Sequence, residues 1–171
     1  SLVLGIDPGS RITGYGLIYV QGSRLSYVGC GCIRTEESAL PARLKKIFDG
    51  LSQLVETHRP SQAAIEEVFV GRNASSALKL GQARGAAMAA CLQSKLEVSE
   101  YSARQVKQAV VGTGAAQKGQ VQHMVKALLG ISDTLAEDAA DALAVAICHT
   151  NTQRSLIGLA GAKSFSRKRL R

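Results

Sequence analysis

The stretch LVLGIDPGSRITGYGLIYVQGSRLSYVGCGCI, residues 2–33, decides the fold. It contains three apolar runs rich in Val, Ile, Leu and Tyr, at residues 2–6, 16–20 and 25–33. The turn-forming triplets Pro8-Gly9-Ser10 and Gln21-Gly22-Ser23 separate these runs. This pattern predicts three strands in an antiparallel meander.

The rest of the chain alternates between helical and extended patterns. We expect, in order, a helix at 41–58, a strand at 63–70, a helix after Asn73 to about 95, a strand at 96–101 and helices at about 102–111, 118–129 and 136–150. Pro41 suits a first helical turn and Asn73 suits a helix N-cap. A doubly wound nucleotide fold would alternate strand and helix from the start. The order therefore predicts an α/β domain of the ribonuclease-H-like type, a mixed five-stranded sheet flanked by helices.

Positive charge is concentrated at the C-terminus. The 171 residues carry a net charge of +8. Residues 151–171 contain six Lys or Arg and no acid, so the remainder carries only +2. We expect a single folded domain at 1–150 and a basic, flexible tail at 151–171. Such a tail is either an electrostatic arm for nucleic acid or a solvated end.

Other sequence features narrow the class of protein. No apolar run approaches the roughly 20 residues of a membrane helix, and the N-terminus has no signal-peptide pattern. We therefore expect a soluble, cytoplasmic protein. None of the four cysteines forms a C-x-x-C pair of the kind used in zinc or redox sites, so we expect reduced thiols.

Acidic residues interrupt two of the predicted strands. Asp7 ends the first apolar run, where it either faces a cleft or starts the Pro8-Gly9 turn. Glu66 and Glu67 stand together in the strand predicted at 63–70. Neighbouring strand residues face opposite sides, so one of the two glutamates should point into the protein or a cleft. An unpaired carboxylate there is costly unless it is protonated or binds a cation.

A further acid pair opens the last predicted helix. Asp138 and Asp141 are three residues apart and therefore share one helix face. Acids at this position also suit the helix dipole, which is the simpler explanation for the pair alone. Together with Asp7 and one glutamate of the 63–70 strand they can form a site made only of oxygen ligands, which favours Mg²⁺ or Mn²⁺ over zinc. Two such ions support phosphodiester hydrolysis, so the set is typical of a nuclease.

Several short motifs follow one another along the chain, and together they form a specific set. They are Gly5-Ile6-Asp7-Pro8-Gly9-Ser10, Thr13-Gly14-Tyr15-Gly16, Ala64-Ile65-Glu66 with Phe69, Asn73, Ser76-Ala77-Leu78-Lys79-Leu80-Gly81-Gln82-Ala83-Arg84-Gly85, Tyr101, Arg104-Gln105-Val106-Lys107, Val111-Gly112, Lys118, Gln120-Val121-Gln122 and Asp138-Ala139-Ala140-Asp141-Ala142-Leu143-Ala144. In these motifs, over residues 2 to about 150, the chain resembles the RuvC family of Holliday-junction resolvases.

The resemblance implies a homodimer that works beside the RuvA and RuvB branch-migration proteins. In each subunit it assigns divalent-metal binding and catalysis to Asp7, Glu66, Asp138 and Asp141. The implied cofactor is Mg²⁺, with Mn²⁺ as a substitute and two ions per site. The implied reaction is symmetric nicking of two opposed junction strands in recombination and repair, which leaves 5′-phosphate and 3′-hydroxyl ends.

Five further residues are candidates for DNA contact. Phe69, beside Arg72, either stacks on unpaired bases or packs in the core, and the resemblance favours a wedge at the junction centre. Arg104, Lys107 and Lys118 either form a rim that binds phosphates or belong to a solvated basic face. The resemblance favours DNA for this second group as well.

A stripe of apolar and small residues on the helix after Asn73 has two explanations. Its members, spaced three and four apart, are Leu78, Gly81, Gly85, Met88 and Leu92. Their glycines permit close helix approach, either to the chain's own sheet or to a second subunit.

Three other functions share features of this sequence. An actin-like ATPase also starts with a strand, an Asp and a Gly-rich loop, but it needs two such domains. A non-catalytic junction-binding module would not need four acids. Ribonuclease H or a transposase core would share the metal chemistry, and only the substrate separates them.

Overall fold

The computed structural model describes the backbone of residues 1–36, 39–68, 71 and 73–168, and the side chains of these residues through 161. Its centre is a five-stranded sheet with the order β3-β2-β1-β4-β5. The strands are β1 (Leu2–Asp7), β2 (Ile12–Gln21), β3 (Arg24–Arg34), β4 (Gln62–Glu66) and β5 (Val98–Tyr101). The helices are α1 (Leu40–His58), α2 (Ala74–Gln93), α3 (Ala103–Val111), α4 (Lys118–Leu129) and α5 (Glu137–Lys168).

The sheet is mixed, as the sequence predicts. The first three strands form the antiparallel meander, with Asp7 opposite Gly14 in the β1–β2 pair. After α1 the chain returns through β4, which runs parallel to β1, and after α2 it returns through β5, which runs parallel to β4. The carboxyl ends of β1, β4 and β5 therefore meet at one edge of the sheet.

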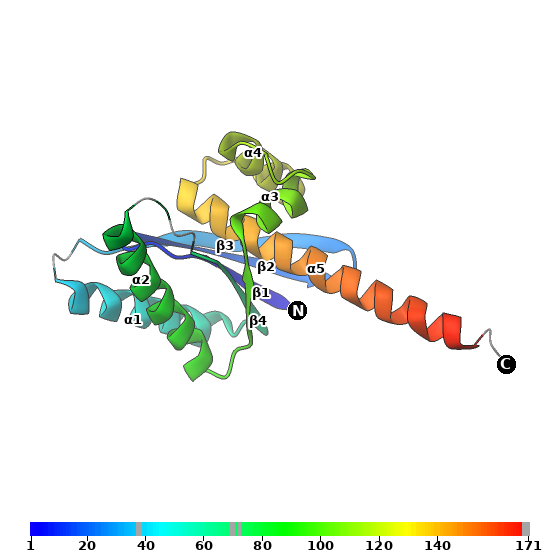
Figure 1. Cartoon of the computed structure of the whole chain (residues 1–171), viewed down its shortest axis with the longest axis horizontal. Coiled ribbons are helices and arrows are strands. Elements are labelled where there is room, and N and C mark those ends of the chain that lie inside the picture. Colours follow the sequence, from blue (N-terminus) through cyan, green and yellow to red (C-terminus); the bar gives the residue numbers. More distant parts are fainter. Residues whose placement is uncertain (37–38, 69–70, 72, 169–171) are drawn as a thin grey trace.

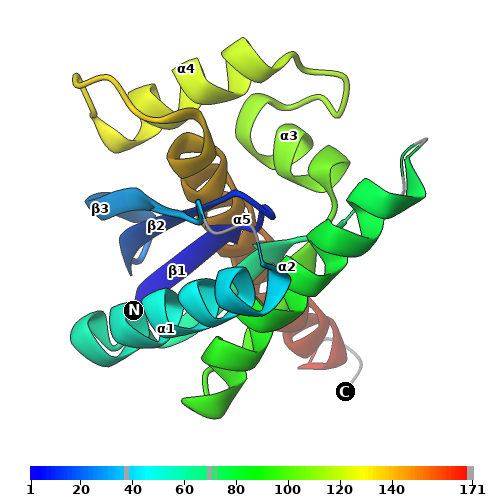
Figure 2. The same ribbon diagram turned by 90° about the vertical axis from the view of Figure 1, so that its left-hand side faces the viewer.

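Helices cover both faces of the sheet (Figures 1 and 2). Helices α1 and α2 pack on one face, over a core that includes Leu4 and Ile65. Helix α5, with α3 and α4 beyond it, packs on the other face over Val3 and Ala64. Because strand side chains alternate between faces, residues 3, 5 and 7 of β1 and residues 64 and 66 of β4 are directed to the α5 side.

Two glycines let α5 lie directly on the strands. A Cβ added at Gly5 would stand 2.0 Å from the carbonyl oxygen of Ala142, and one added at Gly14 would stand 1.9 Å from the carbonyl oxygen of Asp138. No side chain fits at either position. This close approach brings the acidic start of α5 over the end of β1.

The observed elements match the predicted ones in order and type, and their bounds differ most at three places. Strand β2 begins at Ile12, four residues before the apolar run at 16–20. The strand predicted at 63–70 ends at Glu66, so that Glu67 lies outside it. The last helix, expected to end near residue 150, continues to Lys168. The predicted boundary between a 1–150 domain and a 151–171 tail therefore falls within α5 and is not marked by a break in the helix. Figure 1 shows the end of α5 projecting beyond the sheet.

None of the described helices is long and apolar enough to cross a membrane.

Candidate active site

Asp7 and Glu66 occupy equivalent places on neighbouring parallel strands. Each is the last residue of its strand, β1 and β4 respectively. The turn after Asp7 is held by Thr13, whose buried hydroxyl donates to the carbonyl oxygen of Gly9 at 3.2 Å. Thr35 adds a second hydrogen bond, from its hydroxyl to the carbonyl oxygen of Ser10 at 2.9 Å. These contacts hold the turn that follows the end of β1.

The choice between Glu66 and Glu67 is settled by the end of β4. Glu66 is half-buried and faces the α5 side, whereas Glu67 is exposed. The Glu67 N–H donates to the carbonyl oxygen of Tyr101 at 2.8 Å, which extends the sheet pairing by one backbone bond. Only Glu66 therefore reaches the cleft with Asp7.

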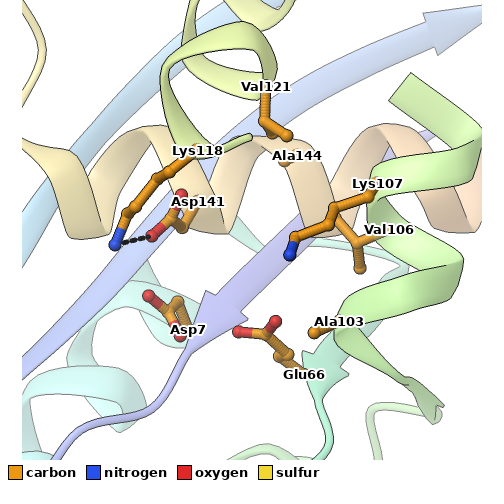
Figure 3. A pocket seen from close by; sticks show the side chains of 9 residues that line it. All are labelled: Asp7, Glu66, Ala103, Val106, Lys107, Lys118, Val121, Asp141 and Ala144. Atoms are coloured by element: carbon orange, nitrogen blue, oxygen red, sulfur yellow. Dashed lines mark ion pairs between the residues drawn. The ribbon is translucent and has the colours of Figure 1, made fainter. Parts of the chain in front are cut away.

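A cavity of about 310 Å³ opens beside these acids (Figure 3). Asp141 enters it from α5, and Lys107 and Lys118 enter from α3 and α4. The remaining lining residues are apolar: Ala103, Val106, Val121 and Ala144. The cavity thus joins three carboxylates and two ammonium groups above an apolar wall.

Asp138 stands apart from the other three predicted ligands. It is half-buried, and its side chain is not part of the cavity lining. Its charge still acts on the site, since it raises the pKa values of both Asp7 and Asp141. The structure therefore brings together Asp7, Glu66 and Asp141, with Asp138 next to them on the first turn of α5.

Crowding of these acids makes ionisation of Asp7 costly. Burial raises the pKa of Asp7 to about 9, assisted by a hydrogen bond with Glu66 and by the negative charges of Glu66, Asp141 and Asp138. Burial also raises the pKa of Asp141, although the ammonium group of Lys118 opposes that rise. If all three cavity carboxylates were ionised, they would outnumber the two cavity ammonium groups.

Lys118, the first residue of α4, is tied to the start of α5. Its ammonium group lies 3.2 Å from the Asp141 carboxylate and also forms an ion pair with Glu137. Burial lowers the pKa of this lysine, but Glu137 and Asp141 outweigh that effect and raise it. Lys118 is thus a neighbour of the acids as well as a member of the predicted basic rim.

Lys107 and Arg104 are separated by the local structure of α3. The helix begins with a capping box in which the Gln105 N–H donates to the Ser102 hydroxyl and the Ser102 N–H donates to the Gln105 side chain. Lys107, further along the same helix, lines the cavity. Arg104 is exposed, does not line the cavity, and lies against Gly114.

Phe69 and Arg72, the other predicted DNA-binding residues, lie outside the described residues. Their predicted roles stay predictions.

Sequence reasoning missed two features near the site. Arg84 of α2 reaches the main chain of Glu66, with Nε 3.1 Å from the carbonyl oxygen. Lys118 pairs with Glu137, which was not a candidate. Neither contact leaves a local signal, because each joins elements that are adjacent only in the fold.

A divalent cation fits this donor set by its chemistry. The ligands are carboxylate oxygens, and the pKa of Asp7 is raised first by burial and then by its acidic neighbours, whose negative charge a cation would offset. Among the described residues, no group of three acids, histidines or cysteines is already arranged to hold a metal. Asp141 is paired with Lys118 instead, so it would have to turn from the ammonium group to complete a ligand set with Asp7 and Glu66.

Comparisons with known proteins point to one family. A family model described as crossover junction endodeoxyribonuclease RuvC matches residues 3–149. The chain is 56% identical over 170 residues to a protein of that name from Francisella tularensis subsp. novicida, covering 99% of both chains. It is 59% identical over 166 residues to the one from Aeromonas salmonicida, covering 97% of this chain and 96% of the other.

Solved structures agree with the sequence relatives. Thermus thermophilus RuvC superposes with a TM-score of 0.83 at 32% identity, over 91% of this chain and 96% of the other. The same protein in complex with a Holliday junction substrate gives a TM-score of 0.84 at 32% identity, over 90% and 95% of the two chains. The yeast mitochondrial Holliday junction resolvase Ydc2 shares the fold, with a TM-score of 0.68 at 14% identity over 98% and 86%. These matches confirm the ribonuclease-H-like fold, and the chain belongs to the RuvC family of crossover junction endodeoxyribonucleases.

Proposed function

We propose that Asp7, Glu66, Asp138 and Asp141 form the metal-binding catalytic centre of this crossover junction endodeoxyribonuclease. The enzyme resolves Holliday junctions in homologous recombination and DNA repair by metal-dependent nicking of two opposed strands, which leaves 5′-phosphate and 3′-hydroxyl ends. The observation that supports the site most strongly is the meeting of Asp7, Glu66 and Asp141 in one cavity, from three elements of the fold.

Nucleases of the RuvC family depend on divalent metal. We assign Mg²⁺ to this site, with Mn²⁺ as a substitute and two ions per centre, because the donor set is all oxygen. When bound, such ions activate water and stabilise the leaving oxygen of the phosphodiester. The protein contributes rigid placement: Asp7 and Glu66 are fixed at strand ends, while Asp138 and Asp141 are fixed near the start of a helix packed against Gly14.

The two cavity lysines are suited to the substrate backbone. Lys107 points into the cavity beside Glu66, where an ammonium group can pair with a phosphate oxygen. Lys118 can do the same if Asp141 turns to the metal and releases it. We include Phe69, Arg72 and Arg104 in the DNA surface, with Phe69 as the wedge that unstacks bases at the junction centre.

The exposed face of α2 supports assembly as a homodimer. Leu78 and Leu92 are 69% and 54% exposed, and no heavy atom lies within 4 Å of the place where a Cβ would stand on Gly81 or Gly85. Leu78, Gly81, Gly85 and Leu92 therefore do not pack on the chain's own sheet, whereas Met88 is half-buried and packs against the core beneath α2. A second copy of the chain would cover these apolar groups and would set two active sites in one particle, as paired nicks require.

Membership of the RuvC family suggests where the enzyme acts and with which proteins. We propose that it acts in the cytoplasm together with RuvA and RuvB. We also propose that the basic residues at 151–171 form an arm that binds a duplex by charge, carried in part by the helical extension of α5.

A panel of labelled substrates tests the proposal. The protein is incubated with Mg²⁺ and a four-way junction, a linear duplex of the same sequences, or an RNA/DNA hybrid. Symmetric nicks in the junction alone, with products that ligase seals, are expected. Preferential cutting of the hybrid would instead indicate a ribonuclease H, and ATP turnover without cutting would indicate an actin-like ATPase.

A further inference from the structure

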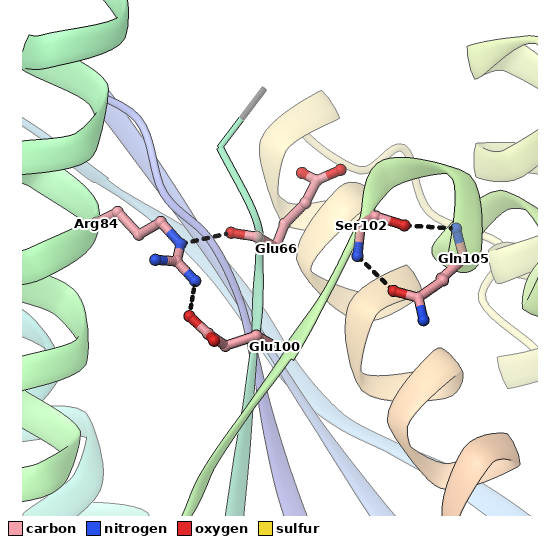
Figure 4. A network of polar contacts seen from close by, with 5 residues as sticks. All are labelled: Glu66, Arg84, Glu100, Ser102 and Gln105. Carbon is pink, nitrogen blue, oxygen red and sulfur yellow. Dashed lines mark hydrogen bonds and ion pairs between the residues drawn. The ribbon is translucent and has the colours of Figure 1, made fainter. Parts of the chain in front are cut away.

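Arg84 connects helix α2 to the strand that carries Glu66 (Figure 4). Its Nε donates a hydrogen bond to the main-chain carbonyl oxygen of Glu66 at 3.1 Å. Its Nη2 forms an ion pair with the carboxylate of Glu100 on β5. One guanidinium therefore ties together the ends of two neighbouring strands.

The carbonyl of Glu66 lies where the sheet ceases to supply a donor. The parallel pairing of β1 with β4 extends through Ile6 and Ile65. Beyond this point β1 reaches Asp7 and then Pro8, which has no N–H. A half-buried carbonyl without a donor is unfavourable. Arg84 supplies the missing hydrogen bond from α2, which packs on the face of the sheet opposite α5.

The guanidinium itself is well fixed. The Arg84 side chain is only 19% exposed, and the next residue toward the N-terminus, Ala83, is fully buried against the sheet. Glu100 balances its charge, and the planar fork of an arginine can donate to the carbonyl and the carboxylate at the same time. A lysine could offer only a point charge to the two acceptors.

The main-chain carbonyl and the side-chain carboxylate of Glu66 face in different directions. Figure 4 shows its carbonyl directed to Arg84 and its carboxylate directed away, on the side of Ser102 and α3. Arg84 therefore does not touch the acids of the cavity. It can influence them only through the main chain of Glu66.

We propose that Arg84 is a positioning residue that fixes the backbone at the end of β4 and so aims the Glu66 carboxylate at the metal. This inference rests on the proposed role of Glu66 in metal binding. Loss of the hydrogen bond leaves the Glu66 peptide free to rotate, and the carboxylate then adopts several directions. Metal affinity and the rate of cutting fall, while phosphate contacts made by other residues are unchanged.

The test compares four variants with the wild-type protein: Arg84→Gln, Arg84→Lys, Glu100→Gln and Glu66→Gln. Mn²⁺ binding is measured without DNA by electron paramagnetic resonance, and single-turnover cleavage of a saturating junction is measured against Mn²⁺ concentration. Junction affinity is measured in Ca²⁺, and unfolding temperature is recorded for each protein. Lys45→Gln is the matched control, because it breaks an exposed ion pair on α1, which packs on the face of the sheet opposite α5.

Arg84→Gln is expected to weaken Mn²⁺ binding and to slow cleavage by about 10-fold or more, the usual cost of losing a residue that orients a metal ligand. Arg84→Lys should be intermediate, and Glu100→Gln should be milder than either because the bond to the Glu66 carbonyl remains. Junction affinity should stay within about two-fold of wild type for all of them, since no phosphate contact is lost. Lys45→Gln should match wild type.

The outcomes separate this inference from the proposed function. Suppose that Arg84→Gln or Arg84→Lys is folded and keeps wild-type Mn²⁺ binding and cleavage, while Glu66→Gln loses both. Arg84 then does not position Glu66. If the Arg84 variants only unfold at lower temperature, and bind Mn²⁺ normally below that temperature, the role is structural and the inference is wrong. If Glu66→Gln itself binds Mn²⁺ and cuts like wild type, the assignment of Glu66 fails instead.

Discussion

Gly14 and Asp138 are in direct contact, so closely that a Cβ on Gly14 would stand 1.9 Å from the carbonyl oxygen of Asp138. This contact sets the distance between α5 and β2, and with it the position of Asp141 relative to Asp7. Strand glycines are usually a weakness, because they have no side chain to pack. Here the glycine is what permits the helix and its acids to reach the strand end.

Gly14→Ala should therefore lower both stability and activity. Overpacking at this contact should cost about 3 kcal/mol, at the upper end of the usual range for such changes. For a chain of this size that lowers Tm by about 6–12 °C. Gly29→Ala on β3 is the matched control, because a Cβ added there would have no neighbouring atom within 4 Å. It should change Tm little. Equal effects at the two positions in a thermal melt would show that the helix contact at Gly14 is not tight.

Lys107 and Lys118 should differ in what their loss does. Lys107→Ala should weaken junction binding and lower the log-log salt slope by about 0.9, as expected for one lost phosphate contact. Lys118→Ala should change the slope less, because its ammonium group is shared with Glu137 and Asp141, but should change the cleavage rate more. Binding isotherms at several salt concentrations and single-turnover rates give the two quantities. Identical slopes and rates for the two variants would contradict the distinction.

The α2 stripe should control oligomeric state. A charge at an exposed leucine of this face, as in Leu92→Glu, should convert a dimer to a monomer without unfolding the chain, because Leu92 is 54% exposed in the isolated subunit. Sedimentation velocity measures the mass. Leu159→Glu makes the same change on an exposed part of α5 and should leave the mass unchanged. A dimer that survives Leu92→Glu and Leu78→Glu together would place the subunit interface elsewhere.

The buried imidazole of His149 should make stability depend on pH. The Tyr101 hydroxyl lies 2.9 Å from Nδ1, and the Gln62 side-chain oxygen lies 3.2 Å from Nε2, so a neutral ring satisfies both partners. Burial lowers the pKa of His149 below its usual value of 6.5, against a smaller effect of Glu97. The unfolded chain then binds the proton more readily than the folded one. The contribution of His149 to the free energy of unfolding is fully present above pH 6.5. It is lost as the pH falls through the lowered pKa of the folded state.

Urea unfolding between pH 5 and 8 measures this effect. His149→Gln removes the titrating group, so its free energy of unfolding should fall less steeply below pH 6.5 than that of wild type. His123→Gln, at an exposed position on α4, should keep the wild-type slope. A wild-type slope in His149→Gln would mean that other groups cause the acid sensitivity.

Much of this fold could be predicted because its signals are local. The meander of residues 2–33 follows from alternating apolar runs and turn residues, and the start of α2 follows from Asn73, whose side chain accepts from the Ser76 N–H at 3.2 Å. The length of α5 was underestimated because residues after 150 lack the apolar pattern of a packed helix. In the structure, residues 155–161 are exposed and form helix without burying a face.

The site was predicted in part for the same reason. Acids at strand ends and at a helix start are visible in the sequence, and three of the four candidates line one cavity. The contacts of Arg84 with Glu66 and of Lys118 with Glu137 were not predicted, since they depend on how α2 and α4 pack. The strand pattern alone left Glu66 and Glu67 open; the resemblance to the RuvC family chose Glu66, and the end of β4 explains why Glu66 lines the cavity.

Cleavage of a four-way junction by Asp7→Asn tests the central claim most directly. Asp7 is half-buried beside Glu66 and Asp141, so an amide there preserves shape while removing one carboxylate ligand of the metal. We predict a single-turnover rate at least about 100-fold below wild type, a loss of about 2.7 kcal/mol of transition-state stabilisation, with junction affinity retained in a gel shift. Near-full cutting by Asp7→Asn in Mg²⁺ would contradict the assignment of this cavity as the active site.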